Sequence, residues 1–251
     1  MLVSVVIPAL NEEDNIRDAV ETVINAAEAA GDTPLDIILI NDGSRDRTGE
    51  ICNQLAGEYP FIQLVHHETN TGMGSSILDG IRLAKHDCLT MFPGDNAVAA
   101  YTLRNLFLNK NEADYVLAII INTEYRSAWR VFLSTLYSFI YTTTFGLPIK
   151  YVNSIGLWPV AMLRKMKLRS RRYSMHAEIN VKLLCRPISF MEVDGYVSLT
   201  RAKSSAVRIV NLLEVARCFL ALCIEVFVTN RKEYAFKPKR IMPPGVEDRE
   251  S

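Results

Sequence analysis

Three clusters rich in Asp, Asn, Glu and Gly follow short apolar segments in the first hundred residues. They are Pro8-Ala9-Leu10-Asn11-Glu12, Asp42-Gly43-Ser44 and Pro93-Gly94-Asp95-Asn96. A carboxylate in such a cluster can accept hydrogen bonds from a base or a ribose, and a neighbouring glycine allows close approach. Asp-Gly is also a strong turn signal, so Asp42-Gly43 taken alone is better explained as a plain turn.

The segments around these clusters alternate between strand and helix patterns. Strands are predicted over residues 3–7, 36–40, 62–65, 88–92 and 115–121, and helices over 12–30, 48–58, 76–85 and 101–109. This alternation predicts an α/β fold, with a mostly parallel sheet and helices on both faces. The three clusters then lie at the carboxyl ends of strands, where ligands bind in such sheets. Their coincidence there favours a binding site.

The pattern changes after residue 122. An aromatic-rich helix is predicted over 127–144, a strand or turn over 155–159, a helix over 175–185, a strand over 188–193 and an amphipathic helix over about 204–229. We therefore expect one domain made of two halves, residues 1–122 and 123–230. Residues 231–251 form a charged tail with prolines, which is expected to be mobile or extended.

The charge of the chain is balanced overall but divided between its halves. The 251 residues include 28 basic and 28 acidic side chains, which disfavours a globally basic nucleic-acid-binding protein. Residues 1–125 hold 7 Lys/Arg and 19 Asp/Glu, whereas residues 126–251 hold 21 and 9. The acidic half is suited to a metal ion, and the basic half to anionic lipid or phosphate.

The compartment and the membrane relation are predicted from apolar segments and cysteines. Five cysteines without zinc-site spacing, and no secretory signal pattern at the start, indicate a reduced, intracellular compartment. In the apolar stretch Val207–Val228, the charged residues Glu214, Arg217 and Glu225 fall in one quadrant of a helix. That pattern predicts an amphipathic helix and not a membrane span; packing on the core and lying in a membrane interface both remain open.

A dinucleotide site is a weak alternative. Gly72-Met73-Gly74 follows a strand and opens a helix, as a Rossmann fingerprint does, but Ile77 stands where the third glycine is needed. The chain also lacks a Walker phosphate-binding loop. Nicotinamide cofactors are therefore disfavoured.

Three segments resemble motifs of the family 2 glycosyltransferases, which have the GT-A fold. Val5 to Glu13 resembles the opening of that family, Ile38 to Thr48 its second motif, and Asn70-Thr71-Gly72-Met73-Gly74 its third. The resemblance covers about the first 110 residues. It is nearest to the subgroup that transfers a sugar to a polyprenyl phosphate, the dolichol-phosphate mannosyltransferase type.

This resemblance implies a nucleotide-diphosphate sugar as donor and inversion at the anomeric carbon. The residues that it implies around the donor are Pro8, Ala9, Asn11, Glu12, Asp42, Gly43, Ser44, Gly72, Gly74, Gly94 and Asp95. It also implies a divalent metal, Mg²⁺ or Mn²⁺, held by Asp95. The family usually has Asp-x-Asp at this point, but Pro93 replaces the first acid, so binding is expected to be weak and metal-free activity remains open.

The second half matches the subgroup more loosely. The resemblance implies that Arg126, Arg130 and Arg201 lie beside the phosphates and act in catalysis with Asp95. It implies acceptor contacts from Glu178, Lys203 and Ser204, although Ala202 departs from the subgroup's Arg-x-x-Gly-Lys-Ser pattern, and Met73 stands where a Lys is common. A phosphate acceptor is already ionised at neutral pH, so it needs no general base.

We therefore predict a GT-A glycosyltransferase with C-terminal amphipathic helices that transfers a sugar to a polyprenyl phosphate. It is expected to lie as a peripheral, monotopic protein on anionic lipid at the cytoplasmic membrane face, where the basic run 164–172 is suited to adhesion. A membrane-protein partner or a second copy of the chain remains open, and no nucleic acid is expected.

Two other readings remain. One is transfer to a hydroxyl of a polysaccharide, lipid or protein, for which Glu178 or Asp95 would supply a base. The other, motivated by Pro93, is a non-catalytic protein that binds sugar nucleotides. The four histidines, His66, His67, His86 and His176, lack metal-ligand spacing and are expected to be structural.

Overall fold

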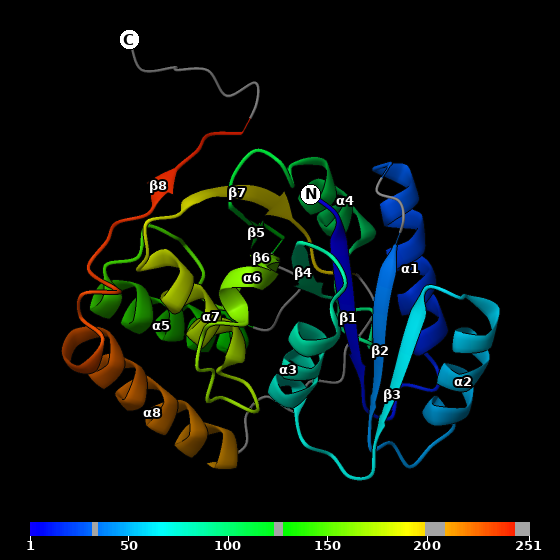
Figure 1. Ribbon diagram of the computed structural model, residues 1–251. Coiled ribbons are helices and arrows are strands. Elements are labelled where there is room, and N and C mark those ends of the chain that lie inside the picture. Colours follow the sequence, from blue (N-terminus) through cyan, green and yellow to red (C-terminus); the bar gives the residue numbers. More distant parts are fainter. Residues whose placement is uncertain (32–34, 123–127, 199–208, 244–251) are drawn as a thin grey trace.

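The computed structural model describes residues 1–31, 35–122, 128–198 and 209–243 (Figure 1). One eight-stranded sheet runs through it in the order β3-β2-β1-β4-β6-β5-β7-β8. The strands are β1 (Val3–Ala9), β2 (Asp36–Asp42), β3 (Ile62–His67), β4 (Cys88–Met91), β5 (Tyr115–Ile120), β6 (Gly156–Pro159), β7 (Ser189–Gly195) and β8 (Lys239–Arg240). The helices are α1 (Ile16–Ala29), α2 (Thr48–Glu58), α3 (Met73–Leu83), α4 (Ala100–Leu108), α5 (Ala128–Phe145), α6 (Val160–Leu163), α7 (Met175–Leu184), α8 (Ile209–Ile224) and the π-helix η2 (Glu225–Thr229).

The sheet is parallel except at β6, which runs antiparallel to both of its neighbours, β4 and β5. In the parallel part, Val6 of β1 is paired with Ile38 on β2 and with Met91 on β4. The carboxyl ends of these three strands therefore meet at one edge of the sheet. This confirms the predicted α/β fold with a mostly parallel sheet.

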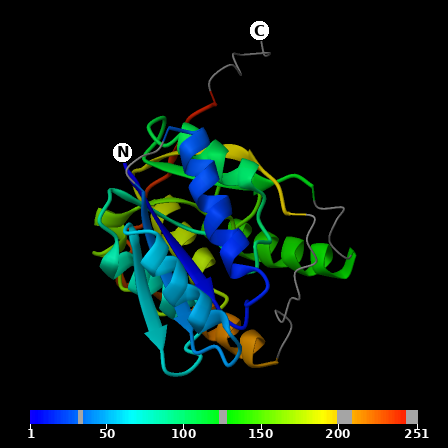
Figure 2. The same ribbon diagram turned by 90° about the vertical axis from the view of Figure 1, so that its right-hand side faces the viewer.

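Helices cover both faces of the sheet. Helix α1 contacts α2 and α4 on one face, and α3 contacts α7 on the other (Figures 1 and 2). The strands are accordingly continuous runs of apolar residues, because both of their faces are covered: residues 5–7 of β1 and 37–40 of β2 are completely buried. Such runs are typical of parallel strands that are buried on both sides.

A buried asparagine ties the second half of the chain together. The Asn180 side-chain oxygen on α7 accepts hydrogen bonds from the Tyr115 hydroxyl (2.7 Å) and from Trp158 Nε1 (3.1 Å). Its amide nitrogen donates to the carbonyl oxygens of Val152 and Ser154. Because this buried amide is fully bonded, it fixes α7 against β5 and β6 without an unpaired polar group. One cluster of buried apolar residues continues through both halves of the chain.

Helix α8 and η2 are held to the core by charged as well as apolar side chains: Leu222 and Val226 belong to the buried apolar cluster. The Lys182 ammonium, which is fully buried on α7, contacts Glu178 (2.9 Å) and Glu225 of η2 (3.0 Å). Arg169 also pairs with Glu225. Nearer the start of α8, Glu214 accepts hydrogen bonds from the hydroxyls of Ser170 and Ser174.

The element boundaries differ from the prediction at a few points. Helix α3 begins at Met73, three residues before the predicted start, because Gly72 with φ +96° ends the preceding loop. The predicted helix over 204–229 is described from Ile209, and its last five residues form η2. In the tail, Lys239 and Arg240 add a short parallel edge strand beside Ser189 and Phe190 of β7.

Replacing Lys182 by Met should strongly destabilise the fold. The variant keeps a long side chain but leaves the carboxylates of Glu178 and Glu225 without their shared buried cation. Removing one partner of a buried ion pair costs about 3–5 kcal/mol, so we expect the free energy of unfolding in urea to fall by about that amount. The control Lys165→Met, at an exposed lysine, should change it by less than about 0.5 kcal/mol. Equal loss in both variants would contradict the buried network as the cause.

Candidate functional site

The loops after β1 and β2 are hydrogen-bonded to each other. The Asn11 backbone N–H donates to Ser44 Oγ (3.0 Å), and the Arg45 backbone N–H donates to Asn11 Oδ1 (2.9 Å). The Glu12 backbone N–H donates to Thr48 Oγ1 (2.7 Å) at the start of α2. Asn11 adopts φ +56°, a conformation that asparagine tolerates better than most residues. The predicted residues Asn11, Glu12 and Ser44 thus lie together.

The loop after β4 joins the same group. The Gly94 backbone N–H donates to the Pro8 carbonyl oxygen (3.1 Å), and a Cβ at Gly94 would lie 2.8 Å from that oxygen. It would also lie 3.1 Å from Ala9 Cβ, so only glycine fits without a shift. The next residue, Asp95, accepts a hydrogen bond from the Ala97 backbone N–H (3.1 Å). The structure therefore brings Pro8, Ala9, Gly94 and Asp95 together.

These loops form an acidic environment. Burial raises the pKa of the Glu12 carboxyl, and the charges of Asp95, Asp46 and Asp14 raise it further, against a lowering hydrogen bond from Asn15. Like charges raise a carboxyl pKa in this way because each disfavours ionisation of the other. A bound diphosphate would be repelled by the same carboxylates unless a cation lay between them.

Asp42, the last residue of β2, is 4% exposed and bound by the loop that precedes α3. Its carboxylate accepts hydrogen bonds from the backbone N–H groups of Thr71 (2.8 Å) and Gly72 (2.9 Å), the Thr71 hydroxyl (2.8 Å) and His67 Nδ1 (2.7 Å). Burial alone would raise the pKa of Asp42, but these hydrogen bonds outweigh it and lower the pKa below the ordinary value. Asp42 thus shapes the loop at residues 69–72, and its direct contact with a nucleoside stays a prediction.

Three glycines allow these loops to approach one another. Gly43 has φ +74°, and a Cβ there would lie 2.5 Å from the Thr69 carbonyl carbon. At Gly72 and Gly74, a Cβ would meet backbone atoms of Arg171 at 2.6 and 2.5 Å. The Ser75 backbone N–H also donates to the Arg171 carbonyl oxygen (3.2 Å). A segment of the second half therefore closes against the start of α3.

Among the predicted site residues that the structure describes, Glu178 lies where it does not fit its expected contact with the acceptor. It is 1% exposed, and its carboxylate accepts hydrogen bonds from the backbone N–H groups of Arg169 and Ser170 and from Lys182 Nζ. A group enclosed in this way cannot reach an acceptor or serve as its base. Glu178 instead fixes the segment at 169–170, and with it the position of Arg171.

The other second-half predictions fall outside what the structure describes. Arg126, Arg201, Lys203 and Ser204 lie outside the described residues. Arg130 lies in the first turn of α5, but its side chain is not among those described. Their roles beside phosphates or acceptor stay predictions.

The basic run 164–172 divides into two groups. The Arg164 guanidinium donates to the carbonyl oxygens of Ile81 (3.1 Å), Arg82 (3.3 Å) and Ala84 (2.7 Å), and so caps the carboxyl end of α3. Arg169 is paired with Glu225. The remaining cations of this run, Lys165, Lys167, Arg171 and Arg172, are exposed.

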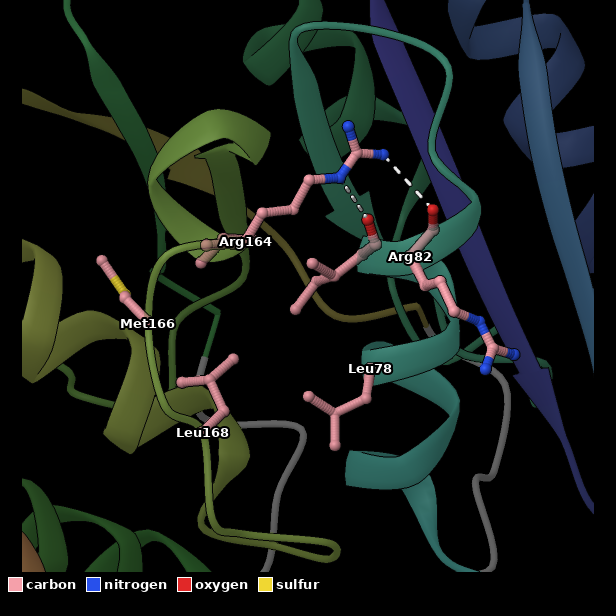
Figure 3. A pocket seen from close by; sticks show the side chains of 7 residues that line it. Leu78, Arg82, Arg164, Met166 and Leu168 are labelled. Carbon is pink, nitrogen blue, oxygen red and sulfur yellow. Dashed lines mark hydrogen bonds between the residues drawn. The ribbon is translucent and has the colours of Figure 1, made fainter.

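A cavity of about 340 Å³ lies beside the Arg164 cap, away from the strand-end loops. Leu78 of α3 and Leu168 face each other across it, whereas the Arg82 side chain points away (Figure 3). Ile81, Leu163 and Met166 complete its apolar wall. It lies at the carboxyl end of α3 and does not adjoin Asp42 or Asp95, so we do not assign it to the donor.

Sequence reasoning missed two residues that order the site. His67 was expected to be merely structural, yet both of its ring nitrogens contact carboxylates, Asp42 and Asp79. Its position at the end of a strand, three residues before the Asn70-Thr71-Gly72 motif, was the available signal. Arg171 contributes through its backbone, which no residue pattern marks.

Comparison with known proteins decides the family. The family described as "Glycosyl transferase family 2" matches residues 4–172. The chain belongs to glycosyl transferase family 2. The match includes every strand-end loop described above, which confirms the predicted family.

Among curated relatives of this glycosyltransferase domain, the probable glycosyltransferase YdaM of Bacillus subtilis is 35% identical over 121 residues, covering 46% of this chain and 28% of YdaM. The dolichyl-phosphate beta-glucosyltransferase ALG5A of Trichomonas vaginalis is 31% identical over 98 residues, covering 38% of this chain and 30% of that protein. The chain thus matches about a third of the length of these relatives.

Solved structures share the fold at low sequence identity. Glucosyl-3-phosphoglycerate synthase of Mycobacterium tuberculosis in complex with UDP superimposes with a TM-score of 0.63 at 17% identity, covering 88% of this chain and 80% of that one. S. aureus TarS residues 1–349 in complex with UDP-GlcNAc gives 0.62 at 16% identity, covering 93% and 69%. These similarities confirm the predicted GT-A fold.

Replacing Gly43 by Ala should disturb the site beyond the cost of backbone strain. Gly43 has φ +74° and a methyl group there would clash with Thr69, whereas Gly31 has φ +65° with open space around it. We expect Gly31→Ala to lower the unfolding free energy by about 1–2 kcal/mol, the cost of a left-handed non-glycine residue. Gly43→Ala should lower it further and displace the Thr71 amide resonance in NMR spectra. Equal destabilisation by both variants would show that close packing of the Thr69 backbone on Gly43 does not contribute.

Proposed function

We propose that this family 2 glycosyltransferase transfers a sugar from a nucleotide-diphosphate sugar to a polyprenyl phosphate at a membrane surface. The donor would lie at the carboxyl edge of the sheet, where the loops after β1, β2, β3 and β4 meet. This edge is bordered on one side by the loop after β1, with Pro8, Ala9, Asn11 and Glu12. On another side lie Asp42 to Ser44 and Gly72 to Gly74, and on the third lie Gly94 and Asp95.

A divalent cation at this edge would have few protein ligands and would be bound largely by the donor's phosphates. Within the described ranges, no three His, Cys, Asp or Glu side chains form a group able to hold a metal ion. Asp95 lies close enough to Glu12 to raise that residue's pKa, so a cation and a diphosphate would neutralise each other in this acidic loop. Mg²⁺ is commonly held by one or two carboxylates with substrate phosphates. We propose that Asp95 holds such an ion, which would draw charge from the leaving diphosphate.

A phosphate acceptor agrees with the chemistry of the described groups. It attacks as an anion and therefore requires no base. A hydroxyl acceptor would require a base. Of the two residues considered for that role, Glu178 and Asp95, Glu178 is buried, which leaves Asp95. If Asp95 holds the metal, it is poorly placed to accept a proton as well, which favours the phosphate.

The observation that carries the lipid acceptor is the exposed apolar surface formed by α5, α8 and η2. Helix α5 packs against the continuous segment of α8 and η2 through aromatic rings. Phe145 of α5 stacks on Phe227 of η2 (5.5 Å between centroids) and contacts Phe219 of α8 edge-on (5.8 Å). Their exposed large apolar side chains, which we call the outer apolar face, are Trp129, Phe132, Leu136, Phe139, Ile140, Leu213, Leu220, Ile224, Phe227 and Val228.

One side of α8 contributes to this face. Glu214 and Glu225 point inward to Ser170 and Lys182, while Leu213, Leu220 and Ile224 point outward. Large exposed apolar side chains gathered on neighbouring helices favour an interaction site. The exposed cations of the 164–172 run and Trp129 in the first turn of α5 are typical of a lipid interface.

No helix in the described parts of the chain has the length and apolarity needed to cross a membrane. We propose that the outer apolar face instead lies in the headgroup region, on the cytoplasmic side, with anionic lipid against the basic residues. Relatives named as dolichyl-phosphate beta-glucosyltransferases and a dolichol-phosphate mannosyltransferase of Pyrococcus furiosus support a lipid phosphate. A relative named as a minor teichoic acid biosynthesis protein keeps the hydroxyl acceptor as the second candidate.

The transfer assay that tests this function compares polyprenyl phosphate with the corresponding polyprenol. The full chain is incubated with labelled UDP- and GDP-sugars and Mg²⁺ or Mn²⁺, and label in the lipid phase is counted. We expect transfer to the phosphate alone. Asp95→Asn should lower the initial rate by more than about tenfold, since even indirect partners of a metal site matter that much. The exposed control Asp18→Asn should match the unchanged protein.

Other outcomes of that assay would contradict the proposal in different ways. Transfer to polyprenol but not to polyprenyl phosphate would replace the acceptor class. Nucleotide binding without transfer to any acceptor would favour the non-catalytic reading. Full activity of Asp95→Asn would remove the metal role from Asp95.

Charges placed on the outer apolar face should abolish salt-resistant membrane binding. We expect the unchanged protein to float with phosphatidylglycerol-containing vesicles at low salt and in part at high salt, because salt screens charge attraction but not apolar insertion. Phe139→Glu with Leu220→Glu should weaken partitioning by more than about a hundredfold, since each buried side chain contributes about 1.5–3 kcal/mol. Leu108→Glu, an exposed apolar position on α4, is the control. Flotation unaffected by the double variant would exclude this face.

A further inference from the structure

His67 links three elements at the carboxyl edge of the sheet, where we propose that the donor binds (the donor edge). It does so through two carboxylates. It is the last residue of β3, and its Nδ1 lies 2.7 Å from Asp42 Oδ1 at the end of β2. Its Nε2 lies 2.8 Å from Asp79 Oδ2 on α3. Two further groups contact this cluster: the Thr71 hydroxyl lies 3.0 Å from Nδ1, and Arg82 pairs with Asp79 (2.8 Å).

Only the protonated ring satisfies both contacts. Carboxylate oxygens accept hydrogen bonds, so each ring nitrogen must donate, and a neutral imidazole carries one N–H. On loss of the second proton, a nitrogen lone pair would face a carboxylate at hydrogen-bond distance. Burial disfavours the charged ring, but the hydrogen bonds to Asp42 and Asp79 outweigh it and raise the pKa of His67 above its ordinary value.

We infer that His67, as an imidazolium, is a positioning residue that holds the loop 69–72 and the start of α3 in the form that binds the donor nucleotide. It would act through Asp42, whose carboxylate holds the Thr71 and Gly72 N–H groups, and through Asp79, which lies two turns into α3. This inference rests on the proposed donor site.

Nucleotide affinity should consequently depend on pH in one direction. The imidazolium is present below the raised pKa of His67 and is lost as the pH rises through it. Asp42, whose pKa is lowered, stays ionised over this range. Order in the loop 69–72 should therefore be greatest near neutral pH and below, and should fall in alkaline solution.

The experiment measures two quantities on the full chain between pH 6 and pH 9. One is the affinity for UDP and for GDP, each with Mg²⁺, by calorimetry. The other is the amide protection factor of residues 69–75 without nucleotide, corrected for the intrinsic pH dependence of exchange. We expect affinity and protection to fall together by at least about fivefold, the lower end of ordinary coupling between sites.

The variants separate positioning from general damage. His67→Gln should give low values with no pH dependence. Asp79→Asn, at a partly exposed helix position, should keep the transition but move its midpoint to lower pH, because one of the two stabilising carboxylates is lost. His86→Gln, a histidine whose Nε2 has no hydrogen-bond partner in the structure, should behave like the unchanged protein.

Each outcome has a distinct meaning. Affinity and protection that are constant with pH, or an unmoved midpoint in Asp79→Asn, would overturn the role of His67 even if nucleotides bind. Protection that follows His67 in a protein that binds neither nucleotide would support the link from His67 to the loop, and it would be the proposed donor site that fails.

Discussion

The buried carboxylate of Asp42 orders the carboxyl edge of the sheet, where we propose that the donor binds. A parallel sheet brings strand ends together but leaves the loops after them to be ordered separately. Asp42 does this for the loop 69–72 by accepting two backbone N–H groups, a hydroxyl and an imidazole. Gly43 then lets that loop pack directly on the backbone beside it. The remaining loops attach through Asn11 to Ser44 and through Gly94 to Pro8.

A second constraint acts in the other half, where buried polar groups hold the last helix together with the apolar contacts of Leu222 and Phe219. Lys182 and Arg169 neutralise Glu225, and Glu214 is bonded to two serines. Burial of these charges is tolerable because each has a partner. With these charged residues facing inward, Leu213, Leu220 and Ile224 of α8 are exposed. They are part of the surface that we assign to lipid.

The clustering of the loops at the carboxyl edge of the sheet was predictable, because strand-end position and residue type are both visible in the sequence. Asn11, Ser44 and Gly94 were named from these signals and lie together. Glu178 was misplaced, because a motif match carries no information on whether a side chain faces inward. His67 was missed for a related reason: its importance comes from Asp42 and Asp79, which approach it only in the folded chain.

The short segment 170–172 touches both α8 and the start of α3. Ser170 is bonded to Glu214, and the next residue, Arg171, packs on Gly72 and Gly74 and accepts from Ser75. Under the proposed orientation, this segment would fix the distance between the lipid surface and the proposed donor site. Acceptors would then be selected by the depth of their phosphate in the interface and not by the length of their isoprenoid tail, which never has to leave the bilayer.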